Sequence, residues 1–287
     1  SLREYLRANS NFTDFDFEGS NFSILIDTLA YNTYVTAYNT NMVANESFID
    51  SATLRENVVA LARNVGYVPS SRRAATANVS FTVDLGSGTT KSSVTLKSGL
   101  VALGDFANTN YTFCTPEDIT SPVTDGFAEF TIDIKQGTFV TNEFVVDTSQ
   151  PNQKFIIPNP YVDTSTLKVQ VRDTLTSSSR KTYSQIDNIV GISTHSETFL
   201  IQEIQDEKYE LLFGDGVLGK KLSNGNVINP TYIVTDGVGG NGVSNFFFSG
   251  KLVDNDGGLI TSGISDVITN QRSSNGAEVE SIDTIRN

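Results

Sequence analysis

Apolar residues recur at helical intervals in the first seventy residues of this chain and at alternate positions in most of the rest. Ser20 is a suitable N-cap for a helix from about Asn21 to Val43. A surface helix of a monomer needs one apolar stripe, but this one carries two on opposite faces. The pattern predicts a helix packed between neighbours, although a central helix within its own small domain stays open. The predicted interface residues are Phe22, Ile26 and Leu29 on one face and Ile24, Tyr31, Val35, Tyr38 and Met42 on the other.

A second helix is predicted shortly after the first. Thr53 and Glu56 have the spacing of a capping box, and apolar residues then recur at helical intervals from Leu54 to Val65. Gly66 is placed to end the helix in a left-handed conformation, and Pro69 follows. Two helices cannot bury a large core, so we expect this helical segment to pack on something else.

From Ala74 the period changes to two, which is typical of strands with one buried face. Alternation is clearest around Val79–Leu85, Phe130–Ile134 and Leu167–Val171, and turn residues such as Asp125-Gly126 separate the runs. Short strands with no helices between them favour an antiparallel sheet. The predicted fold is α+β: an N-terminal helical segment followed by a mainly antiparallel, β-rich body of the sandwich or barrel type.

These patterns divide the chain into three parts. We expect a helical assembly segment at 1–73 and a β-rich domain at 74–262, with room for a second β subdomain inserted at about 100–199. Residues 263–287 are predicted to be a linker and the start of a helix that leads into a C-terminal region beyond this sequence.

Charge and composition exclude several classes of function. The 287 residues carry a net charge of −13, with no cluster of Lys and Arg, which argues against binding to nucleic acid. No apolar run approaches the roughly 18 residues that span a bilayer, so no membrane partner is expected. Cys114 and His195 are the single cysteine and histidine, which excludes an intrachain disulfide and zinc sites built from Cys or paired His. His195 is interpreted as a surface residue.

Two glycine-rich runs resemble ligand-binding loops but lack essential parts. Gly214, Gly216 and Gly219 have the G-x-G-x-x-G spacing, yet the residues that follow cannot form the helix that a nucleotide site requires. Gly214, Asp215 and Gly216 are therefore predicted to form a structural turn. The run Asp254–Gly258 lacks the later oxygen ligands of a calcium loop. We predict no catalytic residue, no cofactor and no metal.

Several stretches resemble baseplate proteins of contractile phage tails. Asn45–Val58 and Ala62–Pro69 are similar to the N-terminal region of baseplate wedge proteins of T-even-type myoviruses. Tyr209–Lys220, Thr235–Gly242 and the tail Asn275–Ile282 are similar to the wider baseplate J-like family. The segment from about 100 to 199 carries no motif that matches.

The resemblance implies a structural, non-enzymatic subunit of the baseplate wedge, which holds the ring around the tail hub and takes part in its rearrangement on contraction. It implies a place in the virion after synthesis in the host cytoplasm. The implied partners are another copy of the chain, a different wedge protein joined through a helical bundle, and neighbouring wedge or sheath-initiator proteins. Gly66 and Pro69 are the predicted hinge. A host-receptor adhesin and, less favoured, a carbohydrate-active tail enzyme are the alternatives.

Overall fold

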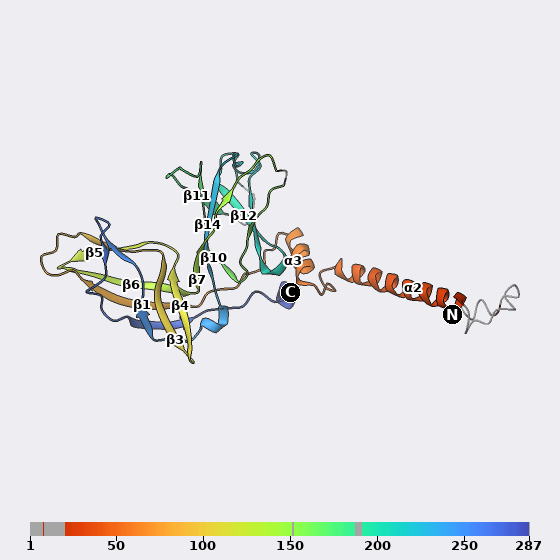
Figure 1. The fold of residues 1–287 in the computed structure, drawn as a ribbon, viewed down its shortest axis with the longest axis horizontal. Coiled ribbons are helices and arrows are strands. Elements are labelled where there is room, and N and C mark those ends of the chain that lie inside the picture. The colour runs from red at the N-terminus through yellow and green to blue at the C-terminus, as the bar shows by residue number, and fades with distance from the viewer. Residues whose placement is uncertain (1–7, 9–20, 151, 187–190, 287) are drawn as a thin grey trace. The chain divides into compact units, whose positions relative to one another are not determined.

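The computed structural model describes residue 8 and residues 21–150, 152–186 and 191–286. The chain divides into two units, one formed by Ser1–Val65 with Arg286–Asn287 and the other by Gly66–Ile285. Gly66–Arg73, which the sequence analysis placed with the helices, therefore groups with the β-rich unit. The first unit contains α2 (Asn21–Glu46) and α3 (Arg55–Asn64) (Figure 1).

Both predicted helices are present, but the start of α3 differs from the prediction. Leu54 is the N-cap residue and makes no side-chain cap, so the capping box of Thr53 and Glu56 is wrong. The carboxylate of Glu46, at the end of α2, instead accepts hydrogen bonds from the Thr53 amide at 2.8 Å and the Thr53 hydroxyl at 2.6 Å. Gly66, with φ of +83°, adopts the left-handed conformation that was expected after α3.

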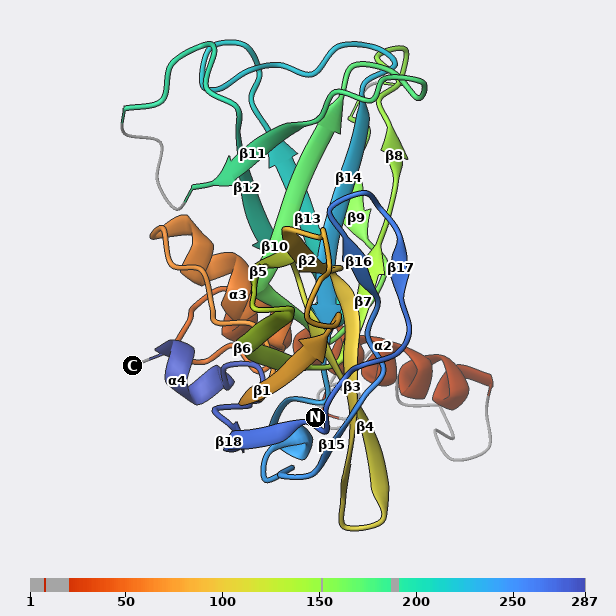
Figure 2. The same ribbon diagram turned by 90° about the vertical axis from the view of Figure 1, so that its left-hand side faces the viewer.

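The β-rich unit consists of two mainly antiparallel sheets, which confirms the predicted fold class. The first sheet has the strand order β15-β3-β4-β6-β5-β2-β16-β17, and β1 joins β6 to β18. Its strands are β1 (Thr76–Asp84), β2 (Ser93–Leu96), β3 (Gly99–Phe106), β4 (Thr109–Thr115), β5 (Ile119–Thr124), β6 (Phe127–Gln136), β15 (Phe246–Phe248), β16 (Leu252–Asp254), β17 (Leu259–Ile260) and β18 (Ile268–Ser274). Figure 2 shows β3 and β4 as a hairpin that extends beyond the rest of the sheet.

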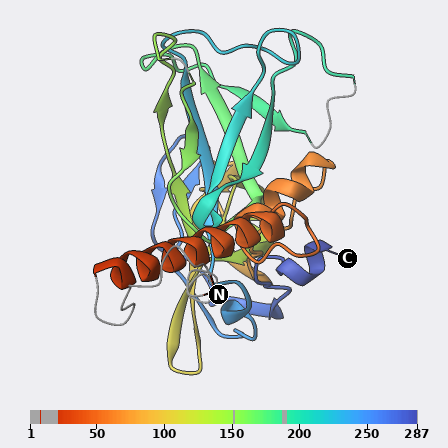
Figure 3. The ribbon, with the colours of Figure 1, turned by 90° about the vertical axis from the view of Figure 1, so that its right-hand side faces the viewer.

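The second sheet is built from one continuous stretch of chain between β6 and β15. Its order is β7-β14-β10-β11-β12-β13-β9, and β8 also pairs with β14. β11 and β12 run parallel, whereas the other strand pairs described in this sheet are antiparallel (Figure 3). Its strands are β7 (Thr138–Thr141), β8 (Phe144–Val145), β9 (Phe155–Ile157), β10 (Val162–Arg172), β11 (Lys181–Gln185), β12 (Thr198–Glu203), β13 (Tyr209–Phe213) and β14 (Val227–Val234). A short 3₁₀ turn, Gln205–Glu207, precedes β13, and another, Gly237–Gly240, follows β14.

Alternating burial along the strands gives each sheet its own apolar core. Every second residue of β1 and β6 is buried, and Phe81 and Phe130 from these strands stack with ring centroids 4.9 Å apart. In the second sheet Tyr232 and Phe199 are fully or almost fully buried. Apolar burial of this kind stabilises a fold by about 25 cal/mol per Å² removed from water.

The chain passes from the first sheet to the second across one glycine. β6 ends at Gln136 and β7 begins at Thr138, and Gly137 between them has φ of +136°. A Cβ atom at this position would lie 2.3 Å from the carbonyl oxygen of Val234. Only glycine combines this backbone conformation with so close an approach to a neighbouring strand.

The last part of the chain is more regular than the sequence indicated. The predicted linker is wrong for Ile268–Ser274, because these residues form β18 and pair with β1. The predicted helix does not begin at Ala277, which instead forms a bridge with Arg73. It begins later, as α4 (Ile282–Arg286).

Candidate functional site

In the described part of the helical unit, α2 exposes several large apolar side chains. Consecutive residues of an α-helix are about 100° apart, so the two predicted stripes lie on opposite faces. On the face that carries Tyr31 and Tyr38, the side chains of Ile24, Tyr31 and Tyr38 are 66%, 70% and 60% exposed, and that of Met42 is 42% exposed. On the opposite face, the side chain of Leu29 is 48% exposed and that of Ile26 is buried. Val35 is half-buried, and the side chain of Phe22 lies outside the described residues.

The helix α2 carries few charged side chains that would favour contact with water. Of its 26 residues, Asp27 and Glu46 are the charged ones. Several hydroxyl groups donate to the helix's own backbone, as Thr33 does to the Leu29 carbonyl and Thr40 to the Thr36 carbonyl, each at 2.8 Å. A hydroxyl satisfied in this way costs little to bury against another chain. The helix therefore has the composition of a buried element, although most of its large apolar side chains in the described residues are exposed.

The junction of α2 and α3 is organised by Glu46. Its carboxylate also accepts hydrogen bonds from the Leu54 amide at 3.3 Å and the Asn57 side chain at 2.7 Å. These bonds, chiefly those from Thr53 and Asn57, lower the pKa of Glu46 from 4.5 to about 2. Beside this junction lies an open groove of about 440 Å³, lined by Met42, Val43, Leu54 and polar neighbours. Arg286 donates to the carbonyls of Ile49 and Ala52 in the same unit.

The run Gly214–Gly219 forms a compact turn after β13. The Asp215 carboxylate accepts from the amides of Val217 and Leu218 at 2.8 and 2.9 Å, and these bonds lower its pKa. Gly216 has φ of +94°, and its amide donates to the Gly219 carbonyl at 3.1 Å. The next element is strand β14, and a phosphate-binding loop needs a helix there.

The loop Asp254–Gly258 is filled by a lysine. The Lys91 ammonium lies 2.8 Å from Asp254 and 2.7 Å from Asp256, and Asp254 also accepts from the Gly258 amide at 2.7 Å. The two carboxylates raise the pKa of Lys91, and Lys91 in turn lowers the pKa of Asp254. A positive charge from the chain itself thus occupies the position that a cation would take.

The remaining reactive side chains are not grouped into a site. His195 is exposed, and its Nδ1 lies 2.9 Å from the Thr194 hydroxyl. Cys114 is buried, which raises the pKa of its thiol, and its sulfur lies 3.0 Å from the Gly137 carbonyl oxygen. Among the residues that the structure describes, no three His, Cys, Asp or Glu side chains are placed to hold a metal. No helix in that part of the chain is long and apolar enough to cross a membrane.

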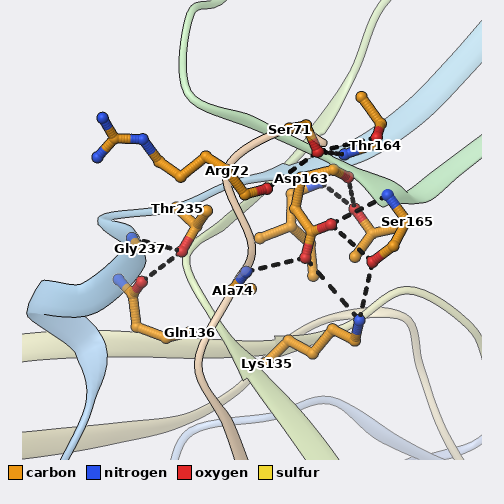
Figure 4. A network of polar contacts seen from close by, with 12 residues as sticks. Ser71, Arg72, Ala74, Lys135, Gln136, Asp163, Thr164, Ser165, Thr235 and Gly237 are labelled. Carbon is orange, nitrogen blue, oxygen red and sulfur yellow. Dashed lines mark hydrogen bonds and ion pairs between the residues drawn. The ribbon is translucent and has the colours of Figure 1, made fainter. Parts of the chain in front are cut away.

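A buried polar network, which the sequence analysis missed, lies where the two sheets meet (Figure 4). The Asp163 carboxylate, from β10, accepts from the Ala74 amide at 2.9 Å and from the Ser165 amide and hydroxyl at 3.0 and 2.6 Å. Lys135 of β6 lies 3.9 Å from it. Asp163 is 1% exposed, so the carboxylate joins β10 to the residues around it in a site shielded from water.

A second part of the network centres on Gln136, at the end of β6. Its side-chain oxygen accepts from the Thr235 hydroxyl at 2.7 Å and the Asp236 amide at 3.0 Å, and its amide group donates to the Asp236 carboxylate at 2.7 Å. Thr235 also accepts from the Gly237 amide. Gln136 is 2% exposed, and these bonds satisfy both ends of its side chain.

These observations define a class of protein. The exposed apolar helix fits an assembly interface, and the β-rich unit is stabilised by structural polar contacts. Both features are common in proteins that assemble with other chains.

Comparisons with known proteins point in the same direction. A family model described as the helical domain of gp6-like baseplate wedge proteins matches residues 1–67. Baseplate wedge protein gp6 of Enterobacteria phage T4 is 28% identical over 275 residues, which cover 88% of this chain and 40% of that protein. The chain therefore spans less than half the length of this relative. It is similar to baseplate wedge proteins along most of its sequence, whereas its likeness to the baseplate J-like family stays a prediction.

Proposed function

We propose that this chain is part of a structural subunit of a baseplate wedge in a contractile phage tail, and that it is located in the virion. The observation that carries the proposal is the match to a baseplate wedge protein over 88% of the chain, which takes in both the helical and the β-rich unit. The family model matches the helical unit separately.

In this proposal α2 is the assembly interface. Its partners are another copy of the chain and a different wedge protein, joined in a helical bundle. Burying each large apolar side chain stabilises such a bundle by about 1.5–3 kcal/mol. Tyr31, Tyr38 and Met42 are suited to the centre of the contact, because aromatic residues and Met are enriched in interface cores. Other wedge proteins or the sheath initiator then contact the β-rich unit.

The role of the β-rich unit is to hold geometry rather than to catalyse. Its two sheets are fixed to each other by the buried bonds of Asp163 and Gln136. A baseplate changes shape when the tail contracts, and such transitions repack interfaces between rigid bodies. We therefore expect the β-rich unit to move as one body within a ring around the tail hub.

Substitutions on the two faces of α2 test this proposal. Tyr31→Glu and Tyr38→Glu each place a charge in the apolar stripe to which both tyrosines belong. Asn32→Glu places the same charge between the two stripes. The chain would be produced together with the wedge proteins of its own phage, and complexes would be separated by size-exclusion chromatography with light scattering. We expect the apparent affinity of each Tyr variant for the wedge proteins to fall by at least about tenfold, since burying an unpaired charge costs several kcal/mol.

Two controls make the result decisive. Far-ultraviolet circular dichroism of each isolated variant should match the unchanged chain, because all three positions are exposed. Asn32→Glu should assemble normally. If Tyr31→Glu and Tyr38→Glu variants assemble as well as Asn32→Glu, α2 is not the interface. If the unchanged chain enters no complex with wedge proteins, the proposed function is wrong.

A further inference from the structure

The segment Tyr67–Ala74 follows α3 after Val65 and Gly66 and belongs to the β-rich unit. It contains one isolated bridge, at Arg73, and is otherwise irregular. Irregular segments are ordinarily the most mobile parts of a fold. This one is held along its length by hydrogen bonds to residues far away in the sequence, and we call it the strap.

Glu280 holds the beginning of the strap. Its Oε1 accepts a hydrogen bond from the Tyr67 hydroxyl at 2.6 Å, and its Oε2 accepts one from the Ser70 amide at 2.8 Å. Its own amide donates to the Ser70 carbonyl at 3.1 Å. The hydrogen bond that Tyr67 donates to Glu280 also raises the pKa of Tyr67. Pro69, between these two contacts, is buried. One carboxylate thus bridges a side chain and a backbone amide of the strap.

The far end of the strap has separate anchors. The Arg73 amide donates to the Ala277 carbonyl at 2.9 Å, and the Ala277 amide donates back at 3.0 Å. The Ser71 hydroxyl lies 2.8 Å from that of Thr164, and the Ala74 amide donates to buried Asp163. The strap therefore lies between the start of β10 and the residues that follow β18.

A different contact joins the strap to Glu278. Arg72 forms an ion pair with Glu278 at 2.8 Å, and its guanidinium lies 4.2 Å from the centre of the Tyr161 ring. The Glu278 side chain is 50% exposed. The Arg72 side chain is 16% exposed, so water screens this ion pair mainly from the side of Glu278, which limits its contribution.

We propose that Glu280 is the latch of this strap: it fixes Tyr67–Ser70 to the β-rich unit, so that bending of the chain after α3 is confined to Gly66. The hinge predicted at Gly66 and Pro69 is thereby narrowed to Gly66, whose left-handed conformation and empty surroundings leave it free to turn. If Glu280 releases its end of the strap, Tyr67–Ser70 becomes a tether between Gly66 and the anchors at Ser71–Ala74. At about 3.3–3.6 Å per residue, its reach is then of the order of 14 Å.

The latch also gives a role to the tail motif. The run Asn275–Glu280 brings Gly276 against the Gly237 carbonyl, where a Cβ atom would lie 2.3 Å from that oxygen. The Asn241 side chain holds Gly276 through its backbone amide and carbonyl at 2.8 and 3.0 Å. The loop after β14 therefore fixes the run Asn275–Glu280, and this places the Glu280 side chain against the strap.

Hydrogen–deuterium exchange of the isolated chain tests the latch. Glu280→Ala removes both side-chain acceptors, and Glu280→Gln and Tyr67→Phe each weaken one of the two side-chain contacts. Glu278→Gln is the matched comparison, since it removes the neighbouring negative charge. We expect Glu280→Ala to speed exchange in a peptide covering Tyr67–Ala74 by about tenfold or more, as local opening becomes easier. Glu280→Gln and Tyr67→Phe should give intermediate rates, and Glu278→Gln should be close to the unchanged chain.

Three outcomes would overturn the proposal. The first is unchanged exchange of the strap in Glu280→Ala, and the second is an equal loss of protection in Glu278→Gln. The third is unchanged exchange of the Ser70 amide in Tyr67→Phe, in which Glu280 keeps its bond to that amide. If Glu280→Ala also speeds exchange in β10 and β13, the Tyr67→Phe variant is the deciding measurement. Exchange of its strap at the rate of the unchanged chain would refute the latch. The experiment needs no partner protein, so its result is independent of the proposed function.

Discussion

Removing the carboxylate of Asp163 should destabilise the β-rich unit more than any other single change of charge described above. In Asp163→Ala, the amide of Ala74 and the amide and hydroxyl of Ser165 lose their acceptor. Ser165 is exposed and can bond to water instead, but Ala74 is buried at 1% exposure. The cost therefore falls mainly on the Ala74 amide and on the loss of charge-assisted bonds.

The size of the effect follows from these contacts. A buried donor without a partner costs about 1–3 kcal/mol, and a bond to a charged group contributes about 1.5–3 kcal/mol. Together they give about 3–5 kcal/mol for Asp163→Ala, in the range for breaking a buried polar pair. For a unit of this size, 1 kcal/mol shifts Tm by about 2–4 °C, so Tm should fall by roughly 6–20 °C. Asp163→Asn keeps the shape but turns a donor toward either the Ala74 amide or Ser165, and it should cost about 1–3 kcal/mol.

Thermal unfolding followed by near-ultraviolet circular dichroism measures this directly, because Tyr183 and Tyr232 are buried in the second sheet. The matched control is Asp133→Asn, an exposed carboxylate on β6 that accepts from the Asn78 side chain at 2.7 Å. Surface changes of this kind usually stay within about 0.5 kcal/mol. A Tm for Asp163→Ala within about 2 °C of the Asp133→Asn value would refute the reasoning.

Two further predictions concern the turn after β13 and the junction of the helices. Gly216→Val should lower the free energy of unfolding by more than about 1 kcal/mol, because residue 216 has a left-handed backbone conformation. Gly214→Ala should lower it further, since the new Cβ would lie 2.2 Å from the Gly219 carbonyl carbon. A lower Tm for Gly216→Val than for Gly214→Ala would contradict this order. Glu46 should titrate near 2 in carboxyl NMR, and the midpoint should rise toward 4.5 in Thr53→Val. Because its pKa is lower in the folded chain, its contribution to stability is complete above 4.5 and is lost as the pH falls toward 2. A midpoint unchanged by Thr53→Val would show that Thr53 is not the cause.

The fold class could be predicted because its longest strands carry their own signal. β1 and β6 alternate buried and outward-facing residues almost without interruption, and that pattern is visible in the sequence. β18 has no such signal: most of its residues are polar and exposed, and pairing with β1 gives it its conformation. Strands of two or three residues, such as β8 and β9, are too short to show a period.

Parts of the candidate site could be predicted from the sequence, and other parts could not. The two stripes of α2 could be found because they depend on the period of a single helix. The start of α3 could not, because the carboxylate that bonds to it belongs to Glu46 of the preceding helix. Asp163 and Gln136 have partners about ninety to a hundred residues away. The one local signal is Ser165, two residues after Asp163, a spacing typical of an Asx turn.

The pairing of β1 with β18 sets the order in which the chain can fold during synthesis. Thr76 lies opposite Ser274, so the partner of β1 is synthesised about two hundred residues later than β1 itself. At about 5–20 residues per second, a ribosome needs roughly 10–40 s to produce the intervening chain. The second sheet, built from one continuous stretch, is complete before then. During this interval one edge of β1 is exposed to other nascent chains, and a chaperone that covers this edge would raise the yield of folded protein.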